Sequence, residues 1–188
     1  MLANNQAGTT DKDIVLRCQR GDAASFKQLY RRYQQRVRST LYQLCGRELL
    51  DDLEQEVFLR VWKALPRLRN PDYFSTWLYR ITWNVATDKR RKFAQSPSFT
   101  EDDSSLNMTP SPSSNTPDLM RLHYQDLVQQ GLQLLSLEHR VVLVLHDLED
   151  VPQKEVANIL KLPIGTVKSR LFYARNQIKK FLQQQGAL

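Results

Sequence analysis

The sequence is poor in cysteine and histidine, with two and three of them among 188 residues. Cys18 and Cys45 are too few and too far apart for a disulfide framework or a zinc site, so both are expected to be reduced thiols. His123, His139 and His146 lack metal-ligand spacing, and no nucleophile or carboxylate motif accompanies them. We therefore expect no catalytic site, no metal site and no cofactor.

Long apolar runs are also missing. The longest ones, such as Val141–Leu145, are far shorter than the roughly 20 residues that a membrane span needs. The first residues, MLANNQAGTTDKD, lack the basic start and the apolar core of a secretory signal. These absences predict a cytoplasmic protein without membrane insertion.

Positive charge is abundant but unevenly distributed. Residues 1–94 hold 18 Lys and Arg against 10 Asp and Glu, residues 95–120 hold none against 4, and residues 121–188 hold 9 against 6. The net charge of +7 is therefore divided between two basic blocks around an acidic stretch. This division predicts two small domains and is compatible with a polyanionic partner such as nucleic acid.

The segment Gln95–Asp118 separates the blocks. It contains 7 Ser, 3 Thr and 4 of the 8 prolines, with no basic residue. Such a composition buries too little apolar surface to offset its ordering entropy, which predicts a flexible linker over 95–118 between domains at 1–94 and 119–188. A passive tether and a nucleic-acid mimic that occupies a positive channel in a partner are both open interpretations.

Apolar residues recur at helical spacing throughout, and no window alternates as a half-buried strand does. The fold class is therefore predicted to be all-α, with two helical domains. Four helices are expected before the linker, at Asp11–Arg20, Ala23–Cys45, Leu50–Leu65 and Phe74–Phe93. Four more are expected after it, at Leu119–Leu134, Glu138–Leu148, Pro152–Lys161 and Gly165–Leu182.

The last two predicted helices, joined by the turn LPIG, are typical of a helix-turn-helix. An inward stripe of Val167, Leu171, Ala174 and Ile178 leaves the opposite side of the final helix to solvent. The outward residues are Lys168, Ser169, Phe172, Tyr173, Asn176, Lys179 and Lys180. Two exposed rings beside lysines suit a DNA major groove, and a merely solvated helical hairpin is the alternative.

The helix expected at Phe74–Phe93 combines aromatic rings with cations. Its apolar stripe directs another set outward: Thr76, Tyr79, Arg80, Trp83, Thr87 and Arg90. Rings interleaved with arginines suit single-stranded nucleic acid, because bases stack on rings while cations meet the backbone. The alternative is that Tyr79 and Trp83 pack against another helix of the same domain.

The helix expected at Leu50–Leu65 opens with four acids, which suits the helix dipole. Its inward face is already supplied by Leu53, Val57, Val61 and Ala64. Phe58, Leu59 and Trp62 are therefore expected to be surplus apolar surface rimmed by acids, which predicts a docking site for a basic protein surface. Ordinary packing is the alternative.

Together these segments resemble the extracytoplasmic-function (ECF, group 4) class of bacterial RNA polymerase sigma factors. The resemblance covers nearly the whole chain and rests on VLRCQRGDAASFKQLYRRY (15–33), DDLEQEVFLRVWKAL (51–65), FSTWLYRITWNVATDKRRK (74–92) and LPIGTVKSRLFYARNQIKKF (162–181). It implies a non-enzymatic factor, active in stress responses, that binds core RNA polymerase and directs promoter-specific initiation. It further implies contacts with the polymerase flap region and with promoter DNA, and a separate anti-sigma protein.

The resemblance also implies three groups of site residues. Those that dock on the coiled coil of the largest polymerase subunit are Asp51, Asp52, Glu54, Gln55, Glu56, Phe58 and Trp62. Those that hold the flipped base and melted strand of the minus-ten element are Leu68, Arg69, Asn70, Trp77, Tyr79, Arg80, Trp83, Asn84 and Arg90. Those that read the minus-thirty-five duplex are Thr166, Lys168, Ser169, Arg170, Phe172 and Arg175.

Two other functions compete with this interpretation. A stand-alone helix-turn-helix regulator would explain residues 119–188 and leave the segments DDLEQE and WLYRITWN without a role. A protein-interaction module, such as an antagonist built on a sigma-like fold, would leave the faces that combine basic and aromatic residues unexplained.

Overall fold

The computed structural model describes residues 9–95 and 117–187, and every regular element in these ranges is helical. The first half contains α1 (Asp11–Gln19), α2 (Ala23–Cys45), α3 (Leu50–Ala64), two short 3-10 helices η1 (Leu65–Arg67) and η2 (Pro71–Tyr73), and α4 (Phe74–Gln95). The second half contains α5 (Pro117–Gln133), α6 (Leu137–Leu143), the π-helical turn η3 (Val144–Leu148), α7 (Gln153–Leu160) and α8 (Ile164–Gln184). The predicted all-α fold is confirmed.

Local signals set the helix ends in the first half. Asp22 caps α2, since its Oδ1 accepts from the backbone N of Ala24 at 2.9 Å. Gly46 ends α2 with a φ of 81°, a left-handed conformation that favours glycine. α1, α2, α3 and α4 then pack together around a core of apolar side chains that includes Val37, Leu41, Val57, Phe74 and Leu78.

The second half packs α5, α6 and α7 against α8. Val142, Val156, Val167 and Leu171 lie in its core, each almost fully buried. Gly131 of α5 lies against α8 so closely that an added Cβ would meet Phe181 Cδ1 at 3.0 Å. The helix expected at Glu138–Leu148 is continuous but widens into a π-turn from Val144 onward.

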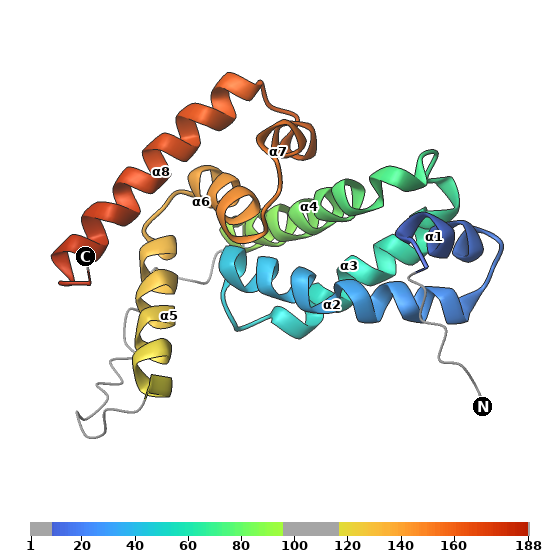
Figure 1. Cartoon of the computed structure of the whole chain (residues 1–188), viewed down its shortest axis with the longest axis horizontal. Coiled ribbons are helices and arrows are strands. Elements are labelled where there is room, and N and C mark those ends of the chain that lie inside the picture. The colour runs from blue at the N-terminus through green and yellow to red at the C-terminus, as the bar shows by residue number, and fades with distance from the viewer. Residues whose placement is uncertain (1–8, 96–116, 188) are drawn as a thin grey trace.

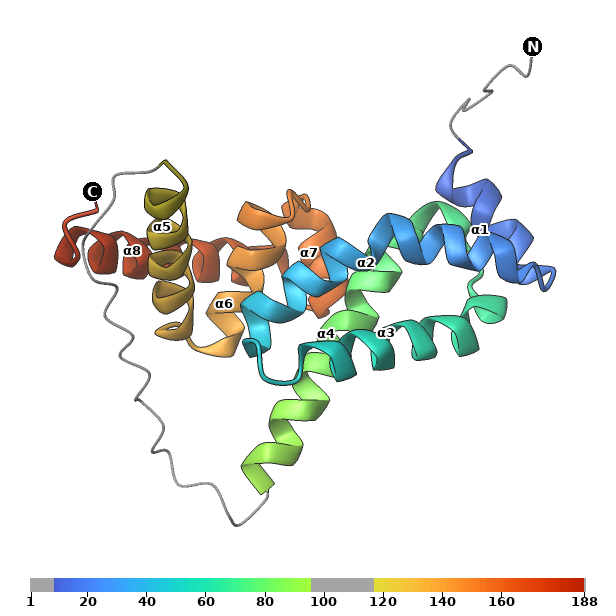
Figure 2. The ribbon, with the colours of Figure 1, turned by 90° about the horizontal axis from the view of Figure 1, so that it is seen from below.

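The two halves pack against each other. α7 lies along α4, and α6 with η3 lies against α2 (Figures 1 and 2). Arg140 of α6 is buried and donates from Nη1 to the Leu44 carbonyl at the end of α2, at 3.0 Å. The expected linker at 95–118 lies almost entirely outside the described residues. No helix within 9–95 or 117–187 is long and apolar enough to cross a membrane.

Candidate functional site

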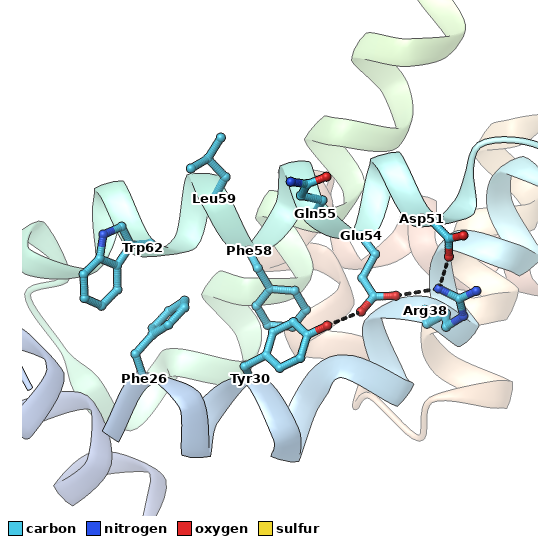
Figure 3. A pocket seen from close by; sticks show the side chains of 9 residues that line it. All are labelled: Phe26, Tyr30, Arg38, Asp51, Glu54, Gln55, Phe58, Leu59 and Trp62. Atoms are coloured by element: carbon cyan, nitrogen blue, oxygen red, sulfur yellow. Dashed lines mark hydrogen bonds and ion pairs between the residues drawn. The ribbon is translucent and has the colours of Figure 1, made fainter. Parts of the chain in front are cut away.

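A groove between α2 and α3 gathers most of the residues expected to dock on a protein partner (Figure 3). It has a volume of about 600 Å³ and is lined by Phe26, Tyr30, Arg38, Asp51, Glu54, Gln55, Phe58, Leu59 and Trp62. Phe26 packs edge-on against Trp62, with ring centroids 4.7 Å apart, and Tyr30 packs in the same way against Phe58 at 4.6 Å. The rings form the floor, and acidic and amide groups form one end.

That end is held by a small polar network. The Glu54 carboxylate accepts from the Tyr30 hydroxyl at 2.9 Å and from Arg38 Nη1 at 2.7 Å. Arg38 Nη1 also donates to Asp51 Oδ1 at 2.5 Å. The hydrogen bond to Glu54 and the partial burial of the phenol raise the pKa of Tyr30, and both acids raise the pKa of Arg38. The groove therefore keeps its acidic end fixed relative to its aromatic floor.

The structure corrects one expectation for this face. Phe58 and Glu54 are buried rather than exposed, because the aromatic side chains of α2 pack over them. Leu59 and Trp62 do remain on the surface, at 44% and 42% exposure. The groove thus exposes less apolar surface than the sequence predicts, and of its two exposed apolar side chains Trp62 is held in place by Phe26.

Two acids expected in the same group lie apart from the groove lining. Asp52 is exposed on the first turn of α3. Glu56 binds Arg60 at 2.7 Å, and Arg60 also binds Asp88 of α4 at 2.9 Å, so Glu56 belongs to a bridge between α3 and α4. Conversely, the α2 lining residues Phe26 and Tyr30 are not among those expected from the sequence. Phe26 and Tyr30 are four positions apart and so share one helix face, next to the buried Leu29 and Tyr33. This spacing is the signal that would have identified them.

A second pocket, of about 420 Å³, lies where the loop before α4 meets its first turns. It is lined by Leu68, Arg69, Asn70, Tyr73, Thr76, Trp77, Arg80 and Asn158. Asn70 shapes the loop, because its Oδ1 accepts from the backbone N of Asp72 at 3.1 Å and caps η2. Five of the expected minus-ten residues therefore meet at one pocket. Tyr79, Trp83 and Asn84 lie outside its lining, and the side chain of Arg90 is outside the described residues.

The face of α4 that was expected to be outward is partly covered. Thr76 and Tyr79 are 7% and 4% exposed, which corrects the expectation that they face solvent. The covering surface belongs to the second half of the chain and not to the same domain. The Tyr79 hydroxyl donates to Glu149 Oε2 at 3.0 Å, and burial beside that carboxylate raises the pKa of Tyr79. Trp83 is half-buried and Asn84 is exposed.

α7 and α8 form the expected helix-turn-helix. Lys161 takes a left-handed conformation, with a φ of 55°, and Pro163 precedes α8. The outward face of α8 is exposed as helical geometry predicts, with Phe172 at 71% and Tyr173 at 50%. Lys168 and Ser169 share this exposed face, while Thr166 is half-buried at its start.

The two arginines of α8 that were expected to reach DNA have acidic partners. Arg175 forms a two-pronged ion pair with Asp147 of η3, at 2.8 and 2.6 Å, which raises the pKa of Arg175. Arg170 pairs with Glu138 at the start of α6. The two ion pairs hold α8 against α6 and η3. Tyr173, absent from the expected group, stacks near His139 with centroids 4.6 Å apart and accepts from Gln177 Nε2 at 2.7 Å.

Comparisons with known proteins match a separate family model to each half of the chain. Sigma-70 region 2 matches residues 29–95, and Sigma-70, region 4 matches residues 125–178. RNA polymerase sigma-H factor of Pseudomonas aeruginosa is 32% identical over 92% of this chain and 94% of its own length. ECF RNA polymerase sigma-E factor of Haemophilus influenzae is 30% identical over 93% and 96%. This chain belongs to the ECF sigma factors.

Solved structures share this fold. The sigma factor superposes with a TM-score of 0.70 on CnrH, solved in complex with the cytosolic domain of CnrY, at 25% identity over 93% of this chain and 97% of that one. Its fold also matches the sigma factor RpoE of Bartonella quintana, solved with the anti-sigma factor NepR, with a TM-score of 0.67 at 23% identity over 84% and 96%.

The protein is an alternative sigma factor that directs promoter-specific transcription initiation. The region 2 match includes most of α2, all of α3 and α4, and hence the larger part of both pockets. The stand-alone regulator is not favoured, because that reading leaves the whole region 2 match unexplained. Sigma factors act as initiation factors rather than as enzymes.

Proposed function

We propose that this sigma factor is a group 4 member and docks on core RNA polymerase through the groove between α2 and α3. The observation that carries the proposal is the groove itself, in which a rigid aromatic floor ends in the Asp51 and Glu54 carboxylates. The ring pairs supply apolar contact area, and fixed acids favour a basic partner surface. The coiled coil of the largest polymerase subunit is the partner that the family suggests.

The proposed division of labour follows the domains. Residues 1–94 dock on polymerase and recognise and melt the minus-ten element, residues 95–118 form the linker, and residues 119–188 recognise the minus-thirty-five element and contact the flap region. The lining of the pocket before α4 includes the Trp77 ring and the Arg80 guanidinium, and a ring beside a cation suits a base and its phosphate, which supports assignment of the pocket to the minus-ten element. Trp83, Asn84 and Arg90 continue that assignment along α4.

The minus-thirty-five element is assigned to the exposed face of α8. Phe172 offers an uncovered ring for thymine methyl groups, and Lys168 offers a cation for phosphate. Thr166 lies in the first turn of the helix, where backbone amides favour an anion, and Ser169 lies one turn later on the same side. Arg170 and Arg175 have donors beyond those used in their ion pairs, so each is assigned a DNA contact as well.

Further partners are inferred from relatives. CnrH and the sigma factor of Bartonella quintana were each solved with a bound protein, the second of them named as an anti-sigma factor. We assign an anti-sigma partner to this chain on that basis. From its family we further assign it a cytoplasmic location, a role in stress responses and no enzymatic activity or cofactor.

The test is transcription with purified core bacterial RNA polymerase and a genomic promoter library, with and without this chain. The expected result is a set of discrete transcripts that require the chain and share two spaced promoter elements. Absence of both transcripts and binding to core polymerase would reject the proposal.

A matched pair of variants locates the docking surface. Leu59→Ser removes an exposed leucine from the groove, whereas Leu16→Ser removes one of similar exposure from α1. Only the first is expected to weaken binding to core polymerase in a titration. Equal affinities for the two variants would place the docking surface elsewhere.

A further inference from the structure

The loop between α3 and α4, which carries part of the pocket before α4, is built from two short turns. In η1 the Leu68 amide donates to the Leu65 carbonyl at 3.0 Å. In η2 the Tyr73 amide donates to the Asn70 carbonyl at 3.2 Å. Each turn is therefore closed by its own backbone. The place at which η1 delivers Leu68, Arg69 and Asn70 to the pocket depends on contacts with other helices.

Gln19, the last residue of α1, supplies such a contact. Its Nε2 donates to the Leu68 carbonyl at 2.8 Å and to the Leu65 carbonyl at 3.1 Å. Both acceptors are carbonyl oxygens, so the side-chain amide fits in one orientation only, because a flipped amide would place its own oxygen against them. The two hydrogen bonds span η1 and end at the residue directly before Arg69 and Asn70.

α1 is firmly held, which makes Gln19 a fixed reference for the loop. Ile14, Val15 and Cys18 of α1 are almost fully buried in the core. The helix end is closed by the Gly21 amide, which donates to the Cys18 carbonyl at 2.9 Å. The half-buried side chain of Gln19 therefore extends from a rigid helix end.

The second turn is tied to α1 more weakly. Lys12 Nζ donates to Asp72 Oδ2 at 3.0 Å, but both side chains are more than half exposed. An exposed ion pair contributes little to stability, because solvent screens it. The hydrogen bonds of Gln19 are partly buried, so they are the stronger polar connection between α1 and the loop.

Gln19 is not part of the pocket lining that the structure describes, which begins at Leu68. It can therefore influence a bound base only through the loop backbone. A loop that is held in its binding conformation before the ligand arrives loses less conformational entropy on binding. Two hydrogen bonds from a rigid helix to the start of the lining segment provide this kind of support.

We propose that Gln19 is a positioning residue for the minus-ten element, which holds the Leu68 backbone so that Arg69 and Asn70 meet a flipped base. The proposal rests on the proposed assignment of this pocket to the minus-ten element. Its consequence is specific: loss of the Gln19 donors weakens the contacts made to the base and leaves the contacts made elsewhere on the DNA unchanged.

The test uses holoenzyme, assembled from core polymerase and the full chain, on fork-shaped DNA of a promoter obtained from the transcription experiment. Each unpaired minus-ten position is made abasic in turn, and fluorescence anisotropy measures the affinity for intact and abasic DNA. Gln19→Met removes both donors and keeps the length of the side chain. Gln129→Met is the matched control, because half-buried Gln129 of α5 also donates from Nε2 to a backbone carbonyl, that of Tyr42, at 3.3 Å.

Wild-type holoenzyme is expected to lose about tenfold in affinity when the base that enters the pocket is removed, as loss of one stacked base does. Gln19→Met is expected to bind intact DNA about threefold more weakly and abasic DNA as the wild type does, so that the ratio falls to about threefold. Gln129→Met keeps the wild-type ratio. Core binding is expected to be unchanged in both variants.

A general structural role of Gln19 gives a different result. It lowers the affinity for intact and abasic DNA equally and leaves their ratio unchanged, which overturns the proposal. Circular dichroism verifies that each variant is folded. If Gln19→Met fails to fold, Gln19→Asn, which keeps the amide on a shorter side chain, is expected to lower the same ratio, and an unchanged ratio in that variant overturns the proposal as well.

Wild-type holoenzyme separates this proposal from the proposed function. If the wild type transcribes and loses affinity at one abasic position, and Gln19→Met loses as much there, only the role of Gln19 is rejected. If the wild type loses no affinity at any abasic position, the assignment of the pocket fails and the role of Gln19 fails with it.

Discussion

Arg38 on α2 donates to the Glu54 carboxylate on α3 at 2.7 Å, and this ion pair closes the acidic end of the proposed docking groove. Glu54 is 8% exposed, whereas Arg38 remains open to solvent. The acid is therefore both a structural tie between two helices and part of the surface that a basic partner would meet. The structural role predicts a change in the free energy of unfolding, and the binding role predicts a change in affinity for core polymerase.

Glu54→Ala is expected to lower the free energy of unfolding by about 1–2 kcal/mol, because the Tyr30 and Arg38 donors lose their shared acceptor. It is also expected to weaken binding to core polymerase. Asp52→Ala, which removes an exposed acid from the same helix, is the control for stability. Denaturant unfolding of both variants measures the free energy of unfolding. Equal values would show that the contacts of Glu54 with Tyr30 and Arg38 contribute nothing to stability.

Trp62→Ala and Trp83→Ala are expected to impair two different steps. Trp62 lines the docking groove, so its loss weakens core binding and leaves promoter melting by assembled holoenzyme intact. Trp83 is half-buried on α4, and its loss is expected to reduce open-complex formation about tenfold while core binding is kept. Permanganate footprinting reports melting, and a core titration reports docking. Loss of core binding in Trp83→Ala would show that the Trp83 ring stabilises the fold and is not used to bind DNA.

Lys168→Ala is expected to weaken binding of promoter duplex broadly across sequences and to lower the slope of log affinity against log salt by about 1, as loss of one phosphate contact does. Lys27→Ala, at an exposed position on α2, serves as the matched cation control. Fluorescence anisotropy over a range of salt concentrations gives both slopes. An unchanged slope in Lys168→Ala contradicts the phosphate assignment.

The ion pair between Arg175 and Asp147 allows a test of what Arg175 does. If the arginine mainly orients α8, Asp147→Ala and Arg175→Ala both lower duplex affinity, because each loosens the same helix. If the arginine mainly contacts DNA, Asp147→Ala frees it and raises duplex affinity. We expect a DNA contact made by an arginine that the acid holds in place, so that both variants lose affinity, with Arg175→Ala losing more. A gain in Asp147→Ala would disprove the orienting role.

The Glu149 carboxyl predicts a pH dependence of the contact between the two halves. Burial raises its pKa above the usual 4.5, against the opposing effects of Tyr79, Thr40, Ser39 and Arg36. A raised pKa means that the packed state favours the protonated acid, so its contribution to stability is largest below pH 4.5 and is lost as the pH rises through the raised value.

Glu149→Gln removes this titration and keeps an oxygen acceptor for Tyr79. The difference in unfolding free energy, variant minus wild type, is therefore expected to become more favourable to the variant as the pH rises from 4.5 toward neutrality. Denaturant unfolding at a series of pH values measures it. A difference that does not vary with pH would show that the carboxyl titrates alike in both states.

The sequence by itself determined the helices and the outward face of α8. Apolar spacing and capping are properties of neighbouring residues, so the eight expected helices recur with ends shifted by a few residues at most, apart from the π-turn of η3. Phe172 is exposed because helix geometry alone places it on the side of α8 away from the buried Val167 and Ala174. The four motifs that carry the family resemblance are local in the same sense.

Tertiary structure decided which of the outward-looking residues are covered. Tyr79 is buried by Glu149, 70 positions later, and Arg175 is held by Asp147, 28 positions earlier. Phe58 lost its expected exposure because Tyr30 of another helix lies on it. Periodicity assigns a side chain to a face of its own helix, but only the packing of distant segments determines whether that face meets water, a neighbouring helix or a partner.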